Sequence, residues 1–246
     1  MHYTLKMWII SERWVRRSFV SWVEQVEQSG FGIIGRVFSA EETERLATSL
    51  GNSGARRSRA GIRHMMSRPV VSAIANSVEL RNIARAVLGD SAIPFRATLF
   101  DKSSTSNWLV AWHQDTALPV QTKRDQAGWG PWSIKDGIAY AHAPAHALER
   151  VLAIRLHLDD SNTANGPLKV LPETQNCGVL TDDQIHALSE AVDPVECCVG
   201  IGGVILMRPL AVHASSKSLS GKPRRVLHIE YTNSLEIDGN LRLAIA

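Results

Sequence analysis

The sequence predicts a mainly β domain of the α+β class, in which helices precede most of the strands. Three observations carry this prediction. The chain of 246 residues is 44% hydrophobic and shows no internal repeat or low-complexity stretch, so a single domain with one core is expected. Helix-capping signals are prominent as far as residue 89. From residue 95 onward, short runs rich in β-branched and aromatic residues favour strands.

Four segments carry helix signals. Capping boxes, in which Ser or Thr is followed three residues later by Glu or Gln, open two of them at Ser39 and Thr181. Gly89 is placed to end a third, and the first shows only apolar residues at helical spacing. The expected helices span 12–28, from 39 to about 50, 79–89 and 182–191.

The strands are expected over residues 95–101, 107–115, 149–159, 166–171, 195–199, 203–207, 211–214 and 224–232. In the 149–159 strand the leucine and isoleucine side chains share one core-facing side, whereas Arg155 and His157 lie on the other. The segment from Ala117 to Ala147 has no clear periodicity. We predict that it is a long loop forming a lid or substrate wall, because Trp129 and Trp132 give it something to pack.

Composition limits the partners and the compartment. The net charge of +3 is modest, and the basic runs at 16–17 and 56–59 accompany no recognition motif, so no nucleic-acid partner is expected. The longest apolar runs fall well short of a membrane span. The three cysteines cannot form a disulfide framework, which favours a reduced, cytoplasmic compartment. The oligomeric state is left open.

A metal motif is the most informative feature of the chain. His113 and Asp115 follow a strand-like run with their side chains on one face, and His213 comes 98 residues after Asp115. Two imidazoles and one carboxylate bind Fe(II) and leave adjacent positions open for a bidentate cosubstrate and O₂. Arg224, 11 residues after His213, is placed to clamp the far carboxylate of a dicarboxylic cosubstrate. This pattern is typical of an oxygenase that uses 2-oxoglutarate.

A second His-x-Asp pair, His157 and Asp159, competes with the first. His157 sits inside a strand whose other face is core, whereas His113 and Asp115 end a strand before a loop that solvent and substrate can reach. The surroundings therefore favour His113 and Asp115.

Several motifs occur together in one order: Phe100-Asp-Lys102, Asn107-Trp108, Trp112-His-Gln-Asp115, Gly128-Trp-Gly-Pro-Trp132, Arg155-Leu-His-Leu-Asp-Asp160, Asn165-Gly-Pro-Leu168, Leu171-Pro172, Met207-Arg-Pro-Leu210 and His213-Ala-Ser-Ser216. Over about residues 30–235 the chain resembles the phytanoyl-CoA dioxygenase family. One departure is Glu173-Thr-Gln175 after the Leu-Pro pair, where many members have Gly-Ser-His.

The resemblance implies a double-stranded β-helix, or jelly roll, with the N-terminal helices packed outside. It implies Fe(II) held by His113, Asp115 and His213, and 2-oxoglutarate held by Arg224 with help from Ser215. Ascorbate is expected to support the reaction. The domain is predicted to run from 30 to 246, after an N-terminal extension over 1–29.

Arg224 and Arg225 compete for the cosubstrate, since only one can point inward from a strand. The spacing from His213 and the polar interior of such barrels favour Arg224. Arg155 and His157 project toward the same interior, as cosubstrate or substrate contacts or as parts of a structural salt bridge.

The predicted activity is hydroxylation of an unactivated carbon in a small organic substrate, with release of succinate and CO₂. A cupin-like hydrolase or isomerase using the same three ligands, and a non-catalytic binding barrel, are the alternatives. Succinate production separates the predicted dioxygenase from these alternatives.

Overall fold

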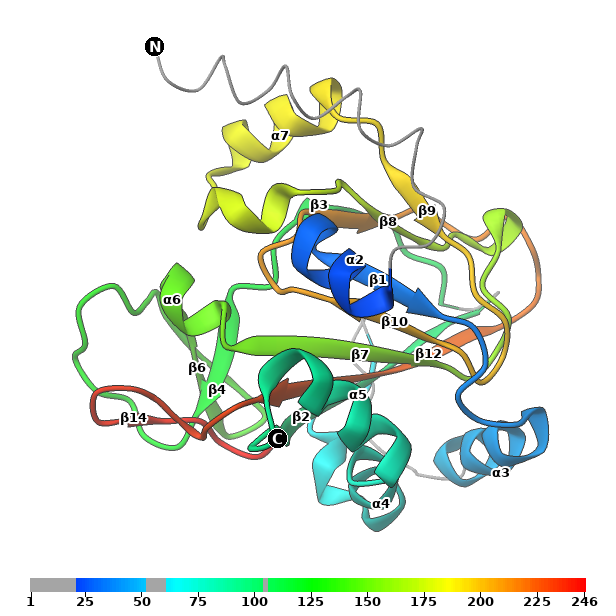
Figure 1. Ribbon diagram of the computed structural model, residues 1–246, viewed down its shortest axis with the longest axis horizontal. Coiled ribbons are helices and arrows are strands. Elements are labelled where there is room, and N and C mark those ends of the chain that lie inside the picture. The colour runs from blue at the N-terminus through cyan, green and yellow to red at the C-terminus, as the bar shows by residue number, and fades with distance from the viewer. Residues whose placement is uncertain (1–20, 52–60, 104–105) are drawn as a thin grey trace.

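The computed structural model describes residues 21–51, 61–103 and 106–246. The first nine residues of the helix expected over 12–28, and the basic runs at 16–17 and 56–59, lie outside the described residues. The chain forms two antiparallel sheets with a cavity between them, helices on their outer faces and a smaller sheet at one end (Figure 1).

The larger sheet has five strands. Its order is β1 (Phe31–Ile34), β10 (Val204–Met207), β7 (Val151–His157), β12 (Arg224–Thr232) and β2 (Ile93–Lys102). Of these, β7, β12 and β2 are the longest. The smaller facing sheet has the order β3 (Val110–His113), β11 (His213–Ser215), β8 (Leu168–Val170) and β9 (Val195–Cys197). Apolar side chains from both sheets, including Met207 and Val170, pack together between them.

The register of the long strands decides which side chains share the cavity. β12 lies between β2 and β7, so Arg224 pairs with Lys102, and His228 pairs with Arg155. Because side chains alternate along a strand, Arg224 and His228 point to the same face. The other face of β7 carries Leu152, Ile154 and Leu156, which are fully buried in the helix-covered core, as the sequence predicts.

Helices cover the outer face of the larger sheet. They are α2 (Trp22–Ser29), α3 (Ala40–Gly51), α4 (Pro69–Ala75) and α5 (Val78–Leu88), and the lower part of Figure 1 shows α4 and α5 against the long strands. Leu80 and Ile83 of α5 pack on the leucines of β7. Val26 of α2 is in the same core, while the start of the domain, predicted at residue 30, stays a prediction.

The helix α7 (Asp182–Ala191) covers the outer face of the smaller sheet. It begins at the capping box formed by Thr181 and Gln184, and its Ile185 packs with Val212 and Trp112. Short 3-10 helices at Met65–Ser67, Thr163–Asn165 and Thr174–Cys177 join the main elements.

The segment from Ala117 to Ala147 is not a structureless loop, and this prediction was wrong. It contains β4 (Ala117–Val120), β5 (Trp132–Lys135) and β6 (Ile138–His142), which form a three-stranded sheet, followed by α6 (Ala145–Leu148). Asp136 and Gly137, both with positive φ, make the two-residue turn between β5 and β6. The strands are too short for a clear alternation. A hairpin of β13 (Glu236–Asp238) and β14 (Leu241–Arg242) packs beside this sheet.

Backbone groups of Ile62 and Ala246 lie along the outer edge of β2. Ile62 exchanges two hydrogen bonds of 2.9 Å with Leu99. Ala246 donates to the carbonyl of Phe95 at 2.8 Å and accepts from the N–H of Ala97 at 2.9 Å. β2 is therefore an edge strand, but much of its outer edge is hydrogen-bonded to these two residues.

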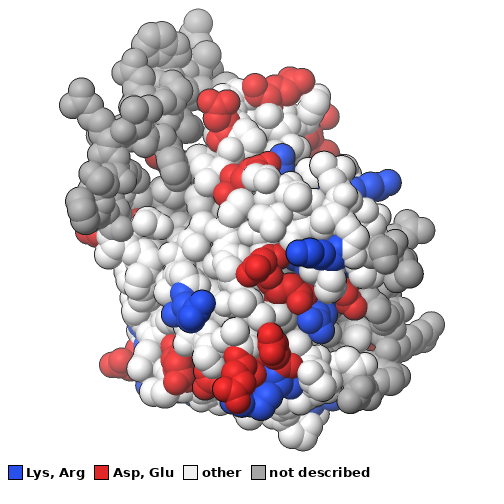
Figure 2. Space-filling view, turned by 90° about the vertical axis from the view of Figure 1, so that its right-hand side faces the viewer, with Lys and Arg blue, Asp and Glu red and all other residues white. Residues whose placement is uncertain are grey.

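The described surface in Figure 2 carries acidic and basic side chains side by side rather than one extended patch of either sign. In residues 21–51, 61–103 and 106–246, no helix combines the length and apolar character needed to cross a bilayer.

Candidate active site

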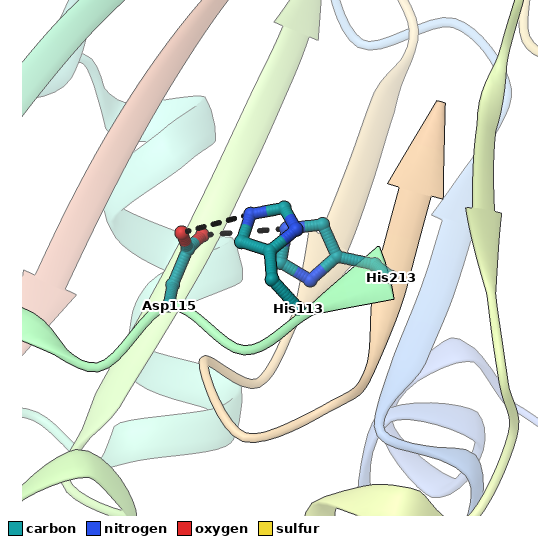
Figure 3. A group of neighbouring side chains, drawn as sticks. All are labelled: His113, Asp115 and His213. Atoms are coloured by element: carbon teal, nitrogen blue, oxygen red, sulfur yellow. Dashed lines mark ion pairs between the residues drawn. The ribbon is translucent and has the colours of Figure 1, made fainter. Parts of the chain in front are cut away.

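Two strands of the smaller sheet bring three potential metal ligands together. His113 ends β3 and pairs in register with His213 at the start of β11. Asp115 lies just beyond β3, where its N–H donates to the carbonyl of Pro209 at 2.9 Å. Its two carboxylate oxygens lie 3.7 Å from Nε2 of His113 and 3.6 Å from Nε2 of His213 (Figure 3). The donor atoms of the three residues all lie within 4.8 Å of one another.

Hydrogen bonds fix the imidazoles in the form that binds a metal. Nδ1 of His113 lies 2.9 Å from the carbonyl of Ala111, and Nδ1 of His213 lies 2.9 Å from the carbonyl of Ala211. A carbonyl oxygen only accepts, so each Nδ1 donates and each Nε2 keeps a lone pair. Both lone pairs are thus available beside Asp115. A nitrogen, nitrogen and carboxylate set of this kind fits Fe(II).

The protonation states agree with that function. Burial and, to a smaller extent, the neighbouring His113 lower the pKa of His213 to about 3, so His213 is neutral near pH 7. Burial alone would raise the pKa of Asp115, but the imidazoles of His213 and His113 outweigh it and hold the pKa well below its usual range. A neutral imidazole and an ionised carboxylate are the ligating forms.

The competing pair is not assembled at this site. His157 is fully buried on the cavity side of β7, and among the described residues neither of its ring nitrogens has a hydrogen-bond partner. Asp159 points away and accepts hydrogen bonds from Nε and Nη2 of Arg225, each at 2.8 Å. The structure therefore brings His213 together with His113 and Asp115, and not with His157 and Asp159.

A second group of donors overlaps the first but has a different chemistry. Donor atoms of Asp115, His228 and Glu230 also lie within 4.8 Å of one another. Nδ1 of His228 accepts from Arg155 at 3.0 Å, so its Nε2 carries the proton and faces Glu230. Glu230 is already paired with Arg96. His228 has no free ring lone pair and Glu230 is neutralised by Arg96, so these two residues form a buried network beside Asp115.

Three buried cations gather at one end of the cavity between the sheets, where Arg155 and Arg224 line it and Lys102 lies beside it, against the lining residue Ser215. Lys102, Arg155 and Arg224 are 1%, 8% and 5% exposed. Nζ of Lys102 donates to Oγ of Ser215 at 3.1 Å and to the carbonyl of Ser216 at 2.6 Å. Nε of Arg224 donates to the carbonyl of Asn165 at 3.2 Å. Within the described part of the chain, no salt bridge joins any of the three to a carboxylate.

These cations lower one another's pKa. Burial lowers the pKa of Lys102 to about 8, with a contribution from Arg224 and then Arg155. Burial likewise lowers the pKa of Arg224 to about 10, with help from Arg155. Buried charges of one sign are costly unless a counterion reaches them. This end of the cavity is therefore suited to an anionic ligand.

The two adjacent arginines face opposite sides of β12. Arg224 lines the cavity, whereas Arg225 pairs with Asp159 outside it. The orientation inferred from strand alternation is the one the structure has, and no bulge interrupts β12 between residues 224 and 230. Ser215 also lines the cavity.

The cavity has a volume of about 250 Å³, and residues that the sequence did not single out line it or lie beside it. Lys102 lies one residue beyond the strand expected over 95–101, with the same facing as Arg96, Thr98 and Phe100. Strand alternation could therefore have predicted that Lys102 faces the same side as these residues. Arg63, Lys135 and Tyr140 come from segments read as loop, so nothing in the sequence pointed to them.

Comparisons with known proteins agree with this architecture. The family model for phytanoyl-CoA dioxygenase matches residues 26–226. The L-proline trans-4-hydroxylase of Streptomyces griseoviridis is 26% identical over 178 residues, which is 62% of this chain. The match spans 59% of that enzyme, less than two thirds of its length.

Two solved structures share the fold. EctD from S. alaskensis with bound Fe is 18% identical, with a TM-score of 0.66 over 91% of this chain and 80% of EctD. The epimerase SnoN in complex with Fe³⁺, alpha ketoglutarate and nogalamycin RO is 15% identical, with a TM-score of 0.64 over 87% of this chain and 83% of SnoN. The predicted double-stranded β-helix is confirmed.

Proposed function

The chain belongs to the phytanoyl-CoA dioxygenase family, and on that premise we propose that it is an Fe(II)- and 2-oxoglutarate-dependent dioxygenase acting on a small organic molecule. In the proposed reaction a substrate C–H, 2-oxoglutarate and O₂ give a substrate C–OH, succinate and CO₂. The observation that carries the proposal is the presence, in one cavity, of a convergent His, Asp and His set and a group of cations without carboxylate partners.

His113, Asp115 and His213 would hold the iron through the two free Nε2 atoms and the carboxylate. Iron bound there supplies activation of O₂ and oxidation of an unactivated C–H bond. The hydrogen bonds from Nδ1 to Ala111 and Ala211 keep the two rings in place before any metal arrives. The ligand set is thereby pre-organised.

Arg224 and Ser215 would bind the 5-carboxylate of 2-oxoglutarate, with Lys102 beside them. Nζ of Lys102 already donates to Ser215, which positions the hydroxyl as a donor toward the carboxylate. Arg224 donates its Nε–H to the carbonyl of Asn165, and its other N–H groups would bind the ligand. A dicarboxylate would thus supply the negative charge that this end of the cavity lacks.

Arg155 has a positioning role in this proposal. Its guanidinium donates to His228 and lies 5.3 Å from the ring of Phe100. His228 in turn faces Glu230, so the chain of contacts holds the inner wall of the cavity rigid. Together with the apolar side chains of Val110 and Leu168, this wall limits the entry of water.

The alternatives make less use of these residues. A hydrolase or isomerase with the same metal ligands has no need for three buried cations at one end of the cavity, and a non-catalytic barrel has no need for the aligned Nε2 atoms. The epimerase SnoN has the same fold, so hydroxylation as the outcome is the finer part of our proposal.

Succinate formation tests the proposal directly. The protein is incubated with Fe(II), 2-oxoglutarate and ascorbate, with and without O₂, and succinate is measured by mass spectrometry. We expect succinate only when iron and O₂ are both present. Asp115→Ala should lower the rate and the iron content by at least about 100-fold, because loss of groups that merely support a ligand already costs about 10- to 100-fold.

Asp159→Asn is the matched control, since Asp159 belongs to the other His-x-Asp pair and binds only Arg225. It should keep iron and activity. Succinate production that persists without iron, or that is lost equally in both variants, contradicts the proposal.

A further inference from the structure

A second group of basic side chains surrounds Tyr140 in the same cavity. Arg63, Arg96 and Lys135 all line it together with Tyr140. Nζ of Lys135 lies 4.5 Å from the centre of the Tyr140 ring, and Cζ of Arg96 lies 5.9 Å from it. The phenol hydroxyl is 3.1 Å from Nε2 of His64. The ring is therefore held between cations and a histidine.

Only one of these cations is neutralised. Arg96 pairs with Glu230 and donates to the carbonyl of Ala117 at 2.7 Å, so its hydrogen bonds are used within the protein. For Arg63 and Lys135, both half-buried, no carboxylate partner occurs among residues 21–51, 61–103 and 106–246. Burial lowers the pKa of Lys135, and the charges of Arg96 and Arg63 lower it further, which shows that the three cations repel one another.

The backbone holds these side chains in position. Arg63 follows Ile62, which is bonded to Leu99 in β2, and Gly61 lies so close to β2 that an added Cβ would be 2.2 Å from the Leu99 carbonyl oxygen. Lys135 ends β5 and pairs with Ile138 across the Asp136–Gly137 turn. The two cations therefore stand on anchored backbone rather than on a free loop.

This group is distinct from the cosubstrate end. Arg96 and Lys102 lie on the same face of β2 six residues apart, which corresponds to about 20 Å along a strand. One small anion cannot neutralise both ends. Asp115, a metal ligand in the proposed function, is the only acidic residue in the described lining of the cavity.

We propose that the substrate is a small organic acid of net negative charge, whose carboxylate or phosphate group binds between Arg63 and Lys135. The inference rests on the proposed function, because it assigns the other end of the cavity to 2-oxoglutarate. Two unpaired cations need an anion, and a lining without a free carboxylate offers no ion-pair partner to an ammonium group. A zwitterionic amino acid therefore fits less well than an acid of the same size.

Ligand binding tests this assignment. The holoprotein is held under anaerobic conditions with Fe(II) and saturating N-oxalylglycine, an unreactive analogue that fills the cosubstrate end. Binding of butanoate, butyl phosphate, butanamide and 2-aminobutanoate is then followed by saturation-transfer NMR. We expect at least one of the two acids to bind more tightly than the amide and the amino acid, and the preferred acid identifies carboxylate or phosphate as the group.

Arg63→Gln/Lys135→Gln should weaken binding of the acid by about tenfold or more. The control is Lys123→Gln/Arg124→Gln, which removes the same charge from two exposed residues after β4 that do not line the cavity. Failure of both acids to bind, equal binding of the amide or amino acid, or equal loss in the control overturns the inference. Conversion of 2-oxoglutarate to succinate by the wild type without substrate tests the proposed function separately.

Discussion

The two ends of the cavity hold positive charge in different ways. At one end Lys102, Arg155 and Arg224 stand on the three long strands of the larger sheet and are nearly inaccessible to solvent. At the other end Arg63 and Lys135 stand on a short connecting segment and on the small sheet, and both remain half exposed. Long paired strands define side-chain positions more strictly than a hairpin does. The buried end therefore suits one fixed ligand, whereas the outer end can differ in its ligand without disturbing the barrel.

Loss of Glu230 tests whether the two ends are independent and should have the largest effect. Its carboxylate is 1% exposed and pairs with Arg96, so Glu230→Ala leaves a buried cation without its partner. We expect the free energy of unfolding to fall by about 3–5 kcal/mol in urea titrations. Glu196→Ala, which removes an exposed pair with Lys169, should cost below about 1 kcal/mol.

The affinity of the folded Glu230→Ala protein for 2-oxoglutarate should stay near that of the wild type. A loss of affinity as large as that produced at Arg224 would show that the two ends act as one site.

Arg224 and Arg225 give the sharpest test of the buried end. Arg224→Ala should raise the apparent requirement for 2-oxoglutarate by about 10- to 100-fold, the equivalent of about 1.5–3 kcal/mol of charge-assisted hydrogen bonding. Arg225→Ala should affect stability instead, because this side chain binds Asp159 outside the cavity. Anaerobic titration of both variants with 2-oxoglutarate in the presence of Fe(II) measures the difference, and a larger defect for Arg225→Ala reverses the assignment.

Lys102 should give this end a pH dependence. Its pKa lies near 8, so the ammonium loses its positive charge as the pH rises through that value. Affinity for 2-oxoglutarate should then fall between pH 7 and pH 9, by less than about tenfold, since bound carboxylate favours the charged form. Lys102→Arg keeps its charge over this range and should show a flat profile. A wild-type profile that is equally flat would exclude a contribution of the lysine charge.

The regular elements could be predicted because their signals are local. The strand over 224–232 and the helix over 182–191 were found with their observed bounds, since the first alternates clearly and the second begins at a capping box. The orientation of Arg224 followed from the same alternation. The small sheet between Ala117 and Ala147 was missed because strands of four or five residues give too few positions for a period to show.

The proposed ligand triad was accessible from the sequence because His113 and Asp115 share a face two residues apart. The facing of Lys102 could also have been inferred from strand alternation, but its meeting with Arg224 and the positions of Arg63 and Lys135 depend on pairing between distant segments. Lys102 faces Arg224 only through the register of β2 with β12. Arg63 reaches the cavity only because Ile62 bonds to Leu99.

The coverage of β2 also bears on solubility. An open strand edge offers unpaired N–H and C=O groups to any other extended chain, and proteins block such edges to avoid aggregation. Here Ile62 and Ala246, which are far apart in the sequence, hydrogen-bond to that edge. The strand they protect carries both Arg96 and Lys102. Any change that frees either segment would expose a template for intermolecular pairing on the wall of the cavity, so precipitation and loss of ligand binding would appear together.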